Sequence, residues 1–209
     1  IPVAVARSEH GNVDAAIKAY EQAIRLNYGA YAPHMKLGTL LMENGKTGRA
    51  LTEFELAVKA SDRDVLARYN YGVALYETGR HDEALSQWAM AAEIDPANLR
   101  VTEALAMGYS GVNDSTAAHY FELADTLGAA SATFHNNYAL LLDRTGRAEE
   151  ADMHFRAAIE RAPAAKRDEY RRNHAVHLLR AGDNQAAVEL FGDLVATGGG
   201  LWSDTVYLA

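Results

Sequence analysis

Small, aromatic and glycine positions recur along this chain at an interval of about 34 residues, with polar and apolar residues mixed at the positions between them. In every copy but the last, a small residue is followed four positions later by an aromatic residue and, three positions after that, by a second small residue. Spacings of four and three place these side chains on one face of a helix, so each copy predicts a helix with one buried face. The aligned positions are Gly11, Gly45 and Gly79; Ala16, Ala50 and Ala84; Tyr20, Phe54 and Trp88; and Ala23, Ala57 and Ala91, continued by Ala117, Ala151 and Ala187, by Phe121, Phe155 and Phe191, and by Gly146 and Gly182.

Glycine and proline residues indicate where these helices begin and end. A Gly such as Gly79 precedes each patterned helix and can adopt the left-handed backbone that turns one helix into the next. Gly38 and Gly72 lie 34 residues apart in the preceding segments, where a Gly lets the two helices of one hairpin nearly touch. Pro96 and Pro163 stop a helix because proline cannot continue one. The pattern therefore predicts a series of helical hairpins.

The stretch 70–96, NYGVALYETGRHDEALSQWAMAAEIDP, is similar to one nearly complete repeat of the tetratricopeptide repeat family, and the resemblance covers residues 1 to about 200. A period near 34 residues is typical of that family. The resemblance implies an all-α fold, a right-handed superhelical solenoid of about six antiparallel helix-turn-helix hairpins, in a single domain over residues 1–209. Val112 in place of a turn glycine and Leu194 in place of the second alanine depart from the pattern, and the first hairpin lacks most of its first helix. The expected hairpins are 1–30 (truncated), 31–64, 65–98, 99–131, 132–165 and 168–197.

An apolar tail, residues 198–209, follows the last expected hairpin. It begins with three glycines and includes Trp202 and Tyr207. One interpretation is a capping segment that covers the exposed edge of the last repeat, which solenoids need. The other is an arm that docks on another subunit.

Composition and charge exclude several classes of protein. The 209 residues, 49% of them hydrophobic, can bury a core, and no run approaches the roughly 18 apolar residues that span a bilayer. The net charge of −8, from 20 Lys and Arg against 28 Asp and Glu, disfavours a nucleic-acid partner. The absence of cysteine leaves the compartment open. We expect a soluble domain, which the resemblance to bacterial proteins given below would place in the bacterial cytoplasm or periplasm. A first residue other than Met is consistent with a removed leader or lipid anchor.

Motifs of catalysis and of cofactor binding do not occur in the sequence. It contains no phosphate-binding loop, no nucleophile elbow and no dinucleotide-binding glycine motif. His174 and His177 lie within one helical turn, but no Glu separates them and no Cys is available to complete a zinc site. We therefore expect no enzyme activity, no cofactor and no metal.

The first helix of each hairpin is expected to line the concave groove of a solenoid, so its off-pattern residues are candidates for partner binding. Asn70, Asn137 and Asn173 occupy equivalent positions, and an Asn amide can pair with the backbone of an extended peptide. The alternative is that these amides hydrogen-bond between neighbouring helices. The candidate groove residues are Met35, Lys36, Tyr69, Asn70, Tyr76, Met107, Asn136, Asn137, Arg172 and Asn173.

A basic cluster contrasts with the acidic chain near the start of the last hairpin. It consists of Lys166, Arg167, Arg171, Arg172 and Arg180. Intrahelical pairs with Asp168 and Glu169 on a solvated face explain it without a partner. The alternative is electrostatic capture of an acidic partner segment.

The leading functional hypothesis is a scaffold or adaptor that binds a partner's peptide or protein segment in the groove. The segment 136–147, NNYALLLDRTGR, resembles bacterial tetratricopeptide repeat proteins of pilus assembly and secretion, which implies a role in envelope assembly. The alternative is a self-assembling structural protein, a homo-oligomer that uses exposed repeat edges and the aromatic tail.

Overall fold

The computed structural model describes residues 13–196, which form eleven α-helices and no strand, so the expected all-α fold is confirmed. None of the helices in this range is long and apolar enough to cross a membrane. The helices are α2 (Val13–Leu26), α3 (Tyr31–Glu43), α4 (Thr47–Ala60), α5 (Val65–Glu77), α6 (His81–Ile94), α7 (Leu99–Tyr109), α8 (Asp114–Thr126), α9 (Ala132–Arg144), α10 (Ala148–Arg161), α11 (Ala164–Ala181) and α12 (Asn184–Ala196).

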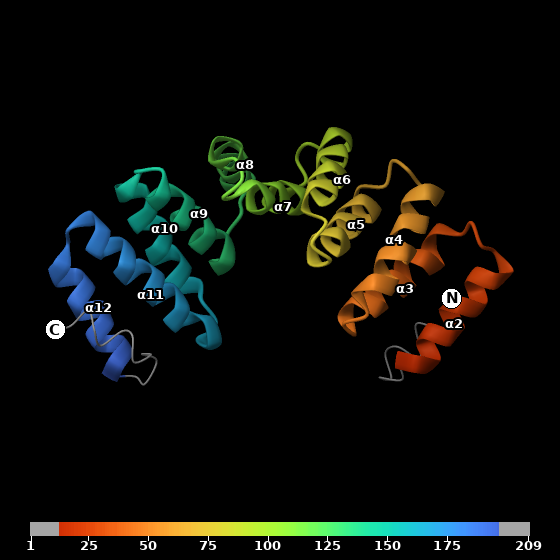
Figure 1. Cartoon of the computed structure of the whole chain (residues 1–209), viewed down its shortest axis with the longest axis horizontal. Coiled ribbons are helices and arrows are strands. Elements are labelled where there is room, and N and C mark those ends of the chain that lie inside the picture. Colours follow the sequence, from red (N-terminus) through yellow and green to blue (C-terminus); the bar gives the residue numbers. More distant parts are fainter. Residues whose placement is uncertain (1–12, 197–209) are drawn as a thin grey trace. The chain divides into compact units, whose positions relative to one another are not determined.

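Consecutive helices pack in pairs within two compact units, one of residues 1–108 and one of residues 109–209. In the first unit α3 packs on α4 and α5 on α6, and α4 packs on α5 to join these hairpins (Figure 1). In the second unit α9 packs on α10 and α11 on α12, with α10 against α11. The expected hairpin packing is therefore observed inside each unit, while the right-handed winding and the single domain stay predictions.

The expected hairpins can be compared with the helix bounds. Helix pairs α3–α4, α5–α6, α7–α8 and α9–α10 fall within the four hairpins expected between residues 31 and 165. The last pair differs, because α11 begins at Ala164 and not at 168. Pro163 lies at the N-cap of α11, and the fixed φ of proline suits a helix start, so α11 follows α10 almost directly. Residues 1–12 of the truncated first hairpin and the tail at 198–209 lie outside the described residues, so both interpretations of the tail stay predictions.

The repeated small–aromatic–small pattern forms the buried face of every second helix. In α10, Ala151, Phe155 and Ala158 are all fully buried. The last copy replaces the second small residue with Leu194, which is also fully buried. Fully buried alanines let the next helix approach closely around the aromatic ring, so the pattern describes the core as predicted.

Positive φ angles mark the turns inside the hairpins. Gly79 has a φ of 81°, in the left-handed region that glycine adopts without strain. Among the described residues, the equivalent turn glycines Gly45, Gly146 and Gly182 also have positive φ. The fourth hairpin was expected to lack this turn glycine because of Val112. Instead Gly111, one residue earlier, takes a φ of 83° and supplies the turn.

Part of the basic cluster is paired within its own helix or with α9. Lys166 contacts Glu169 at 2.7 Å and Arg171 contacts Asp168 at 3.5 Å, as the solvated-face interpretation predicts. Arg180 reaches Asp143 on α9 at 2.8 Å. These pairs supply a structural reason for the cluster that needs no acidic partner.

An ion pair between the start of α8 and the end of α9 makes stability depend on pH. Arg144 donates two hydrogen bonds to the Asp114 carboxylate, at 2.7 and 2.9 Å, and these lower the pKa of Asp114 from 3.8 to about 2. Because the folded-state pKa is depressed, the ion pair stabilises the protein above about pH 4, and this contribution is lost as the pH falls toward 2. Both side chains are about a third or more exposed, so we expect a contribution of about 1 kcal/mol or less.

We therefore expect Asp114→Asn to lower the free energy of unfolding at pH 7 by about 1 kcal/mol or less. The gap between wild type and variant should narrow from pH 4 to pH 3, as followed by urea unfolding with circular dichroism. Asn retains an oxygen that can accept from the Gly111 backbone N–H, so the variant removes the charge and one acceptor for Arg144 while it keeps this backbone hydrogen bond. A gap that stays constant between pH 7 and pH 3 would show that the ion pair does not titrate as described.

Candidate partner-binding site

Trp88 is held against the backbone of α5 by a glycine and a hydrogen bond. A Cβ at Gly72 would overlap the Trp88 indole, so only glycine lets the ring lie this close to α5. The indole Nε1–H donates to the Tyr69 carbonyl oxygen at 3.1 Å. Tyr76 packs beside the indole, with 5.6 Å between the ring centroids. The repeat pattern thus places a rigid aromatic floor beside α5.

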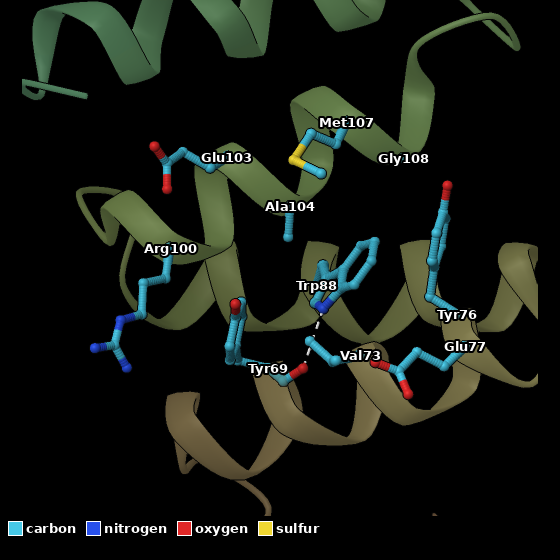
Figure 2. Close-up of a pocket in the computed structure, with 10 residues that line it drawn as sticks. All are labelled: Tyr69, Val73, Tyr76, Glu77, Trp88, Arg100, Glu103, Ala104, Met107 and Gly108. Atoms are coloured by element: carbon cyan, nitrogen blue, oxygen red, sulfur yellow. Dashed lines mark hydrogen bonds between the residues drawn. The ribbon is translucent and has the colours of Figure 1, made fainter. Parts of the chain in front are cut away.

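A pocket of ≈ 280 Å³ opens above this floor, between α5 and α7. Figure 2 shows Tyr69, Val73 and Tyr76 on α5 facing Ala104 and Met107 on α7, with the Trp88 side chain between them. Tyr76 is 39% and Met107 45% exposed, which is high for large apolar side chains. The complete lining is Tyr69, Val73, Tyr76, Glu77, Trp88, Arg100, Glu103, Ala104, Met107 and Gly108.

Charged groups lie at the rim of this pocket. Burial raises the pKa of the Glu103 carboxyl, and burial also raises the pKa of the Tyr69 hydroxyl. Arg100 and Glu103 come from the same helix, yet their side chains extend in different directions (Figure 2). The rim therefore offers an acceptor and a donor to a bound segment, around an apolar centre.

A second depression continues the apolar surface along the same two helices. It is lined by Val65, Leu66, Tyr69, Asn98, Leu99 and Arg100. Tyr69 and Arg100 line both depressions, so the two are contiguous. Leu66, at 47% exposed, adds another accessible apolar side chain. Together the two depressions form the α5–α7 face, a surface long enough to contact several side chains of one partner segment.

The structure brings three of the ten predicted groove residues together in this pocket: Tyr69, Tyr76 and Met107. Lys36 is exposed on α3 and Asn70 is half-buried on α5, and neither lines the pocket. Met35 differs from expectation, because only 7% of it is exposed and it packs in the core shared by α2, α3, α4 and α5. Met35 is therefore not accessible to a partner in this structure.

The asparagines of the second unit pair with each other. Asn173 on α11 donates to Asn136 Oδ1 on α9 at 2.9 Å, and Asn136 is 4% exposed. Asn136 in turn donates to Asn137 Oδ1 at 3.4 Å. The interpretation of a hydrogen bond between helices therefore holds for Asn173, whereas Asn137 is bonded within its own helix. Asn136 is buried and is not an accessible groove residue. Asn137, Asn173 and Arg172 are half-buried, and their binding of a partner stays a prediction.

Sequence reasoning did not assign Trp88, Glu77 or Arg100 to a binding surface. Trp88 belongs to the packing column, and only its place beside Gly72 shows that a packing residue also forms the pocket floor. The sequence does indicate an apolar surface here, because Tyr69, Val73 and Tyr76 share one face of α5 and Met107 lies on α7, the first helix of the following hairpin.

Comparison with solved structures shows the same fold at low sequence identity. Pseudomonas aeruginosa pilF matches with a TM-score of 0.81 and 18% identity, over 99% of this chain and 93% of that chain. YrrB, a tetratricopeptide repeat protein with an unusual peptide-binding site, matches with a TM-score of 0.71 and 19% identity, over 86% and 92% of the two chains. MamA from Desulfovibrio magneticus RS-1 matches with a TM-score of 0.69 and 20% identity, over 76% and 90%. No curated protein sequence matches this chain significantly.

Sequence models of the family match most of the chain. Two tetratricopeptide repeat matches overlap across residues 4–46 and 35–98, and another covers residues 132–164. These matches span more than half of the chain and coincide with the helix pairs described above. The chain belongs to the tetratricopeptide repeat family.

Proposed function

We propose that this protein is an interaction scaffold whose α5–α7 face binds an extended or helical segment of a partner protein. The observation that carries the proposal is the contiguous apolar surface around Tyr69, with Tyr76 and Met107 exposed and Trp88 fixed beneath them. A rigid aromatic floor gives contact area with little loss of conformational entropy on binding. Such sites take apolar anchor side chains from the partner, while rim groups set its orientation.

The comparisons support the proposal at the level of the fold. YrrB is a peptide-binding member of the family, and pilF shares this helical arrangement over nearly the full length of both chains. We extend the proposal to bacterial envelope assembly, on the resemblance of 136–147 to proteins of pilus assembly and secretion and on the likeness to pilF. The proposed role is binding and not catalysis.

The double variant Tyr76→Ala/Met107→Ala tests the site. Both side chains are exposed, so their removal should leave the fold intact. We expect the captured partner to bind the variant at least about tenfold more weakly, because losing buried anchor side chains costs about 2 kcal/mol or more at a binding hot spot. A pull-down from the native host identifies the partner by quantitative mass spectrometry, and titration of the purified partner then gives the dissociation constants.

A matched control removes exposed apolar side chains elsewhere. Met153→Ala/Val188→Ala truncates residues that are 61% and 46% exposed on α10 and α12. The control should bind the partner as the wild type does. Equal affinity for the wild type and the pocket variant would rule out the α5–α7 face as the binding site. Light scattering over a range of concentrations tests the self-assembly alternative, which a strictly monomeric chain would contradict.

A further inference from the structure

Two histidines and an aspartate from three successive helices of the second unit meet at one point. Asp125 lies on α8, His135 on α9 and His154 on α10. One ligand atom from each residue lies within 4.8 Å of the other two. The Nδ1 atoms of the two imidazoles are 3.0 Å apart. Imidazole nitrogen with carboxylate oxygen is a donor set that divalent transition metals favour.

The equivalent contact in other hairpins pairs chemically complementary groups. A residue of the first helix meets the residue 19 positions later on the second helix, and in α3–α4 these are His34 and Glu53, at 2.7 Å. In α5–α6 the same contact joins an arginine donor to the Gln87 carbonyl oxygen, at 3.0 Å. His135 and His154 instead bring two imidazoles together, with a hydrogen bond between their Nδ1 atoms in which one ring donates and the other accepts. A bound cation would replace this hydrogen bond and take a lone pair from both nitrogens.

The geometry leaves room for a metal after a small adjustment. Two nitrogen ligands of a tetrahedral Zn²⁺, each about 2.0–2.1 Å from the ion, lie about 3.3 Å from one another. The observed Nδ1···Nδ1 distance of 3.0 Å is a few tenths of an ångström shorter. Asp125 is exposed, so its carboxylate is free to turn toward the ion. His135 is 8% exposed and packs edge-on against the Phe134 ring. This packing limits the orientation of the His135 imidazole before a metal ion binds.

Charges around the cluster are compatible with a cation. Burial lowers the pKa of both imidazoles, which favours the neutral form that binds metals. Arg147 lies near His154 and Arg161 lies near His135. The Arg147 guanidinium is paired with Glu122 and Glu150 at 2.7 Å, and the Arg161 guanidinium is paired with Glu160 at 3.4 Å. The carboxylates of Asp125 and Glu150 add negative charge beside His154.

We propose that Asp125, His135 and His154 bind one divalent transition metal ion, Zn²⁺ in the first instance, and that the ion joins α8 to the α9–α10 hairpin. Three protein ligands leave a fourth position for water. The ion would tighten the contact between neighbouring hairpins of the second unit, since its ligands come from both. This site is separate from the α5–α7 face and does not depend on the proposed function.

The sequence-based expectation of no metal was argued for His174 and His177. In the structure each of these histidines is hydrogen-bonded to a different carboxylate. His174 hydrogen-bonds to Asp152 and His177 to Asp143, each at 2.7 Å. The cluster proposed above instead joins residues far apart in the sequence, and only the register of the helices brings them together.

Calorimetric titration of the full chain with Zn²⁺ tests the proposal, with any affinity tag removed. We expect one saturable site in the wild type. His154→Gln should abolish it, and Asp125→Asn should weaken it at least about tenfold, because even outer-shell changes cost 10–100-fold in metal affinity. His119→Gln, which removes an exposed histidine of α8, is the matched control and should bind as the wild type does. Co²⁺ should also bind and give the visible absorption of a tetrahedral site, whereas Mg²⁺ should not compete.

Three results would overturn the proposal. The first is no saturable Zn²⁺ binding in the wild type. The second is unchanged binding in both His154→Gln and Asp125→Asn, which would place the ion elsewhere. The third is an equal loss in His119→Gln, which would indicate scattered surface binding. Asp125 is exposed, so its variant stays informative even if His154→Gln were poorly folded.

Discussion

Replacing Phe155 with alanine is expected to lower the free energy of unfolding by about 3–5 kcal/mol. Phe155 is fully buried on α10, and its ring packs against His174 and His177 of α11, with centroid separations of 5.6 and 5.3 Å. Truncation removes contacts to both histidines and leaves a cavity at the junction of two hairpins. Collapse around the cavity is restricted, because the two histidines are also hydrogen-bonded to Asp152 and Asp143. Urea unfolding followed by circular dichroism measures the loss.

Met153→Ala provides the matched control on the same helix. Met153 is 61% exposed, so its truncation should change the free energy of unfolding by no more than about 0.5 kcal/mol. Hydrogen exchange should locate the damage of Phe155→Ala in α9 to α12, because a repeat contacts only its neighbours. A loss below about 1 kcal/mol would mean that the aromatic column does not hold the hairpins together.

The repeated core could be predicted from the sequence because the same small and aromatic residue types recur at the same helical spacing from copy to copy. Phe155 is buried for the same reason as Phe54 and Trp88, since a small residue stands four positions before each and three positions after. Agreement between copies fixes the helical face and the pairing of helices without knowledge of the surroundings. The turn at Gly111 shows where this prediction fails. The glycine lies one residue before the aligned turn position, so the sequence alignment misses it although the backbone keeps the left-handed conformation.

The lining of the candidate site could be predicted only in part, because exposure depends on neighbouring helices and not on a residue's own repeat. Tyr69, Tyr76 and Met107 line the pocket, and their binding of a partner stays a prediction. Met35 is buried because α2, α4 and α5 all contribute to the core around it, and packing between hairpins cannot be read from the position of Met35 within its own repeat. Asn136 was misplaced because a polar side chain that pairs across helices has the same sequence signal as an exposed one.

The cluster of Asp125, His135 and His154 was missed for a related reason. Metal motifs are recognised by short spacing along one helix, whereas His135 and His154 are 19 residues apart. The separation of 19 recurs at the His34–Glu53 and Tyr69–Trp88 contacts, so it expresses the register of the hairpin. This separation identifies the His135–His154 pair in the sequence, whereas Asp125 joins the pair only through the packing of α8.

Replacing Gly38 with alanine is expected to lower the free energy of unfolding by about 1–3 kcal/mol, although alanine is the better helix former. A Cβ on Gly38 would lie 2.6 Å from Cε1 of Phe54, well inside van der Waals contact. Phe54 cannot retreat easily, because it is 2% exposed and Ala50 and Ala57 on the same face are fully buried. Helices α3 and α4 would have to separate, and urea unfolding measures the cost.

Gly48→Ala on α4 separates this clash from helix propensity. A Cβ at Gly48 meets nothing within 4 Å, so its substitution should leave stability unchanged or raise it by up to about 1 kcal/mol. Shortening the opposing ring with Phe54→Leu should recover part of the loss in the Gly38→Ala background, which a double-mutant cycle reports as a coupling energy. If Gly38→Ala stabilised the protein as much as Gly48→Ala does, a methyl group would fit between α3 and α4 without a clash. The opposite signs we expect follow from one difference between the two glycines, which is whether an aromatic ring already fills the space a methyl group would take.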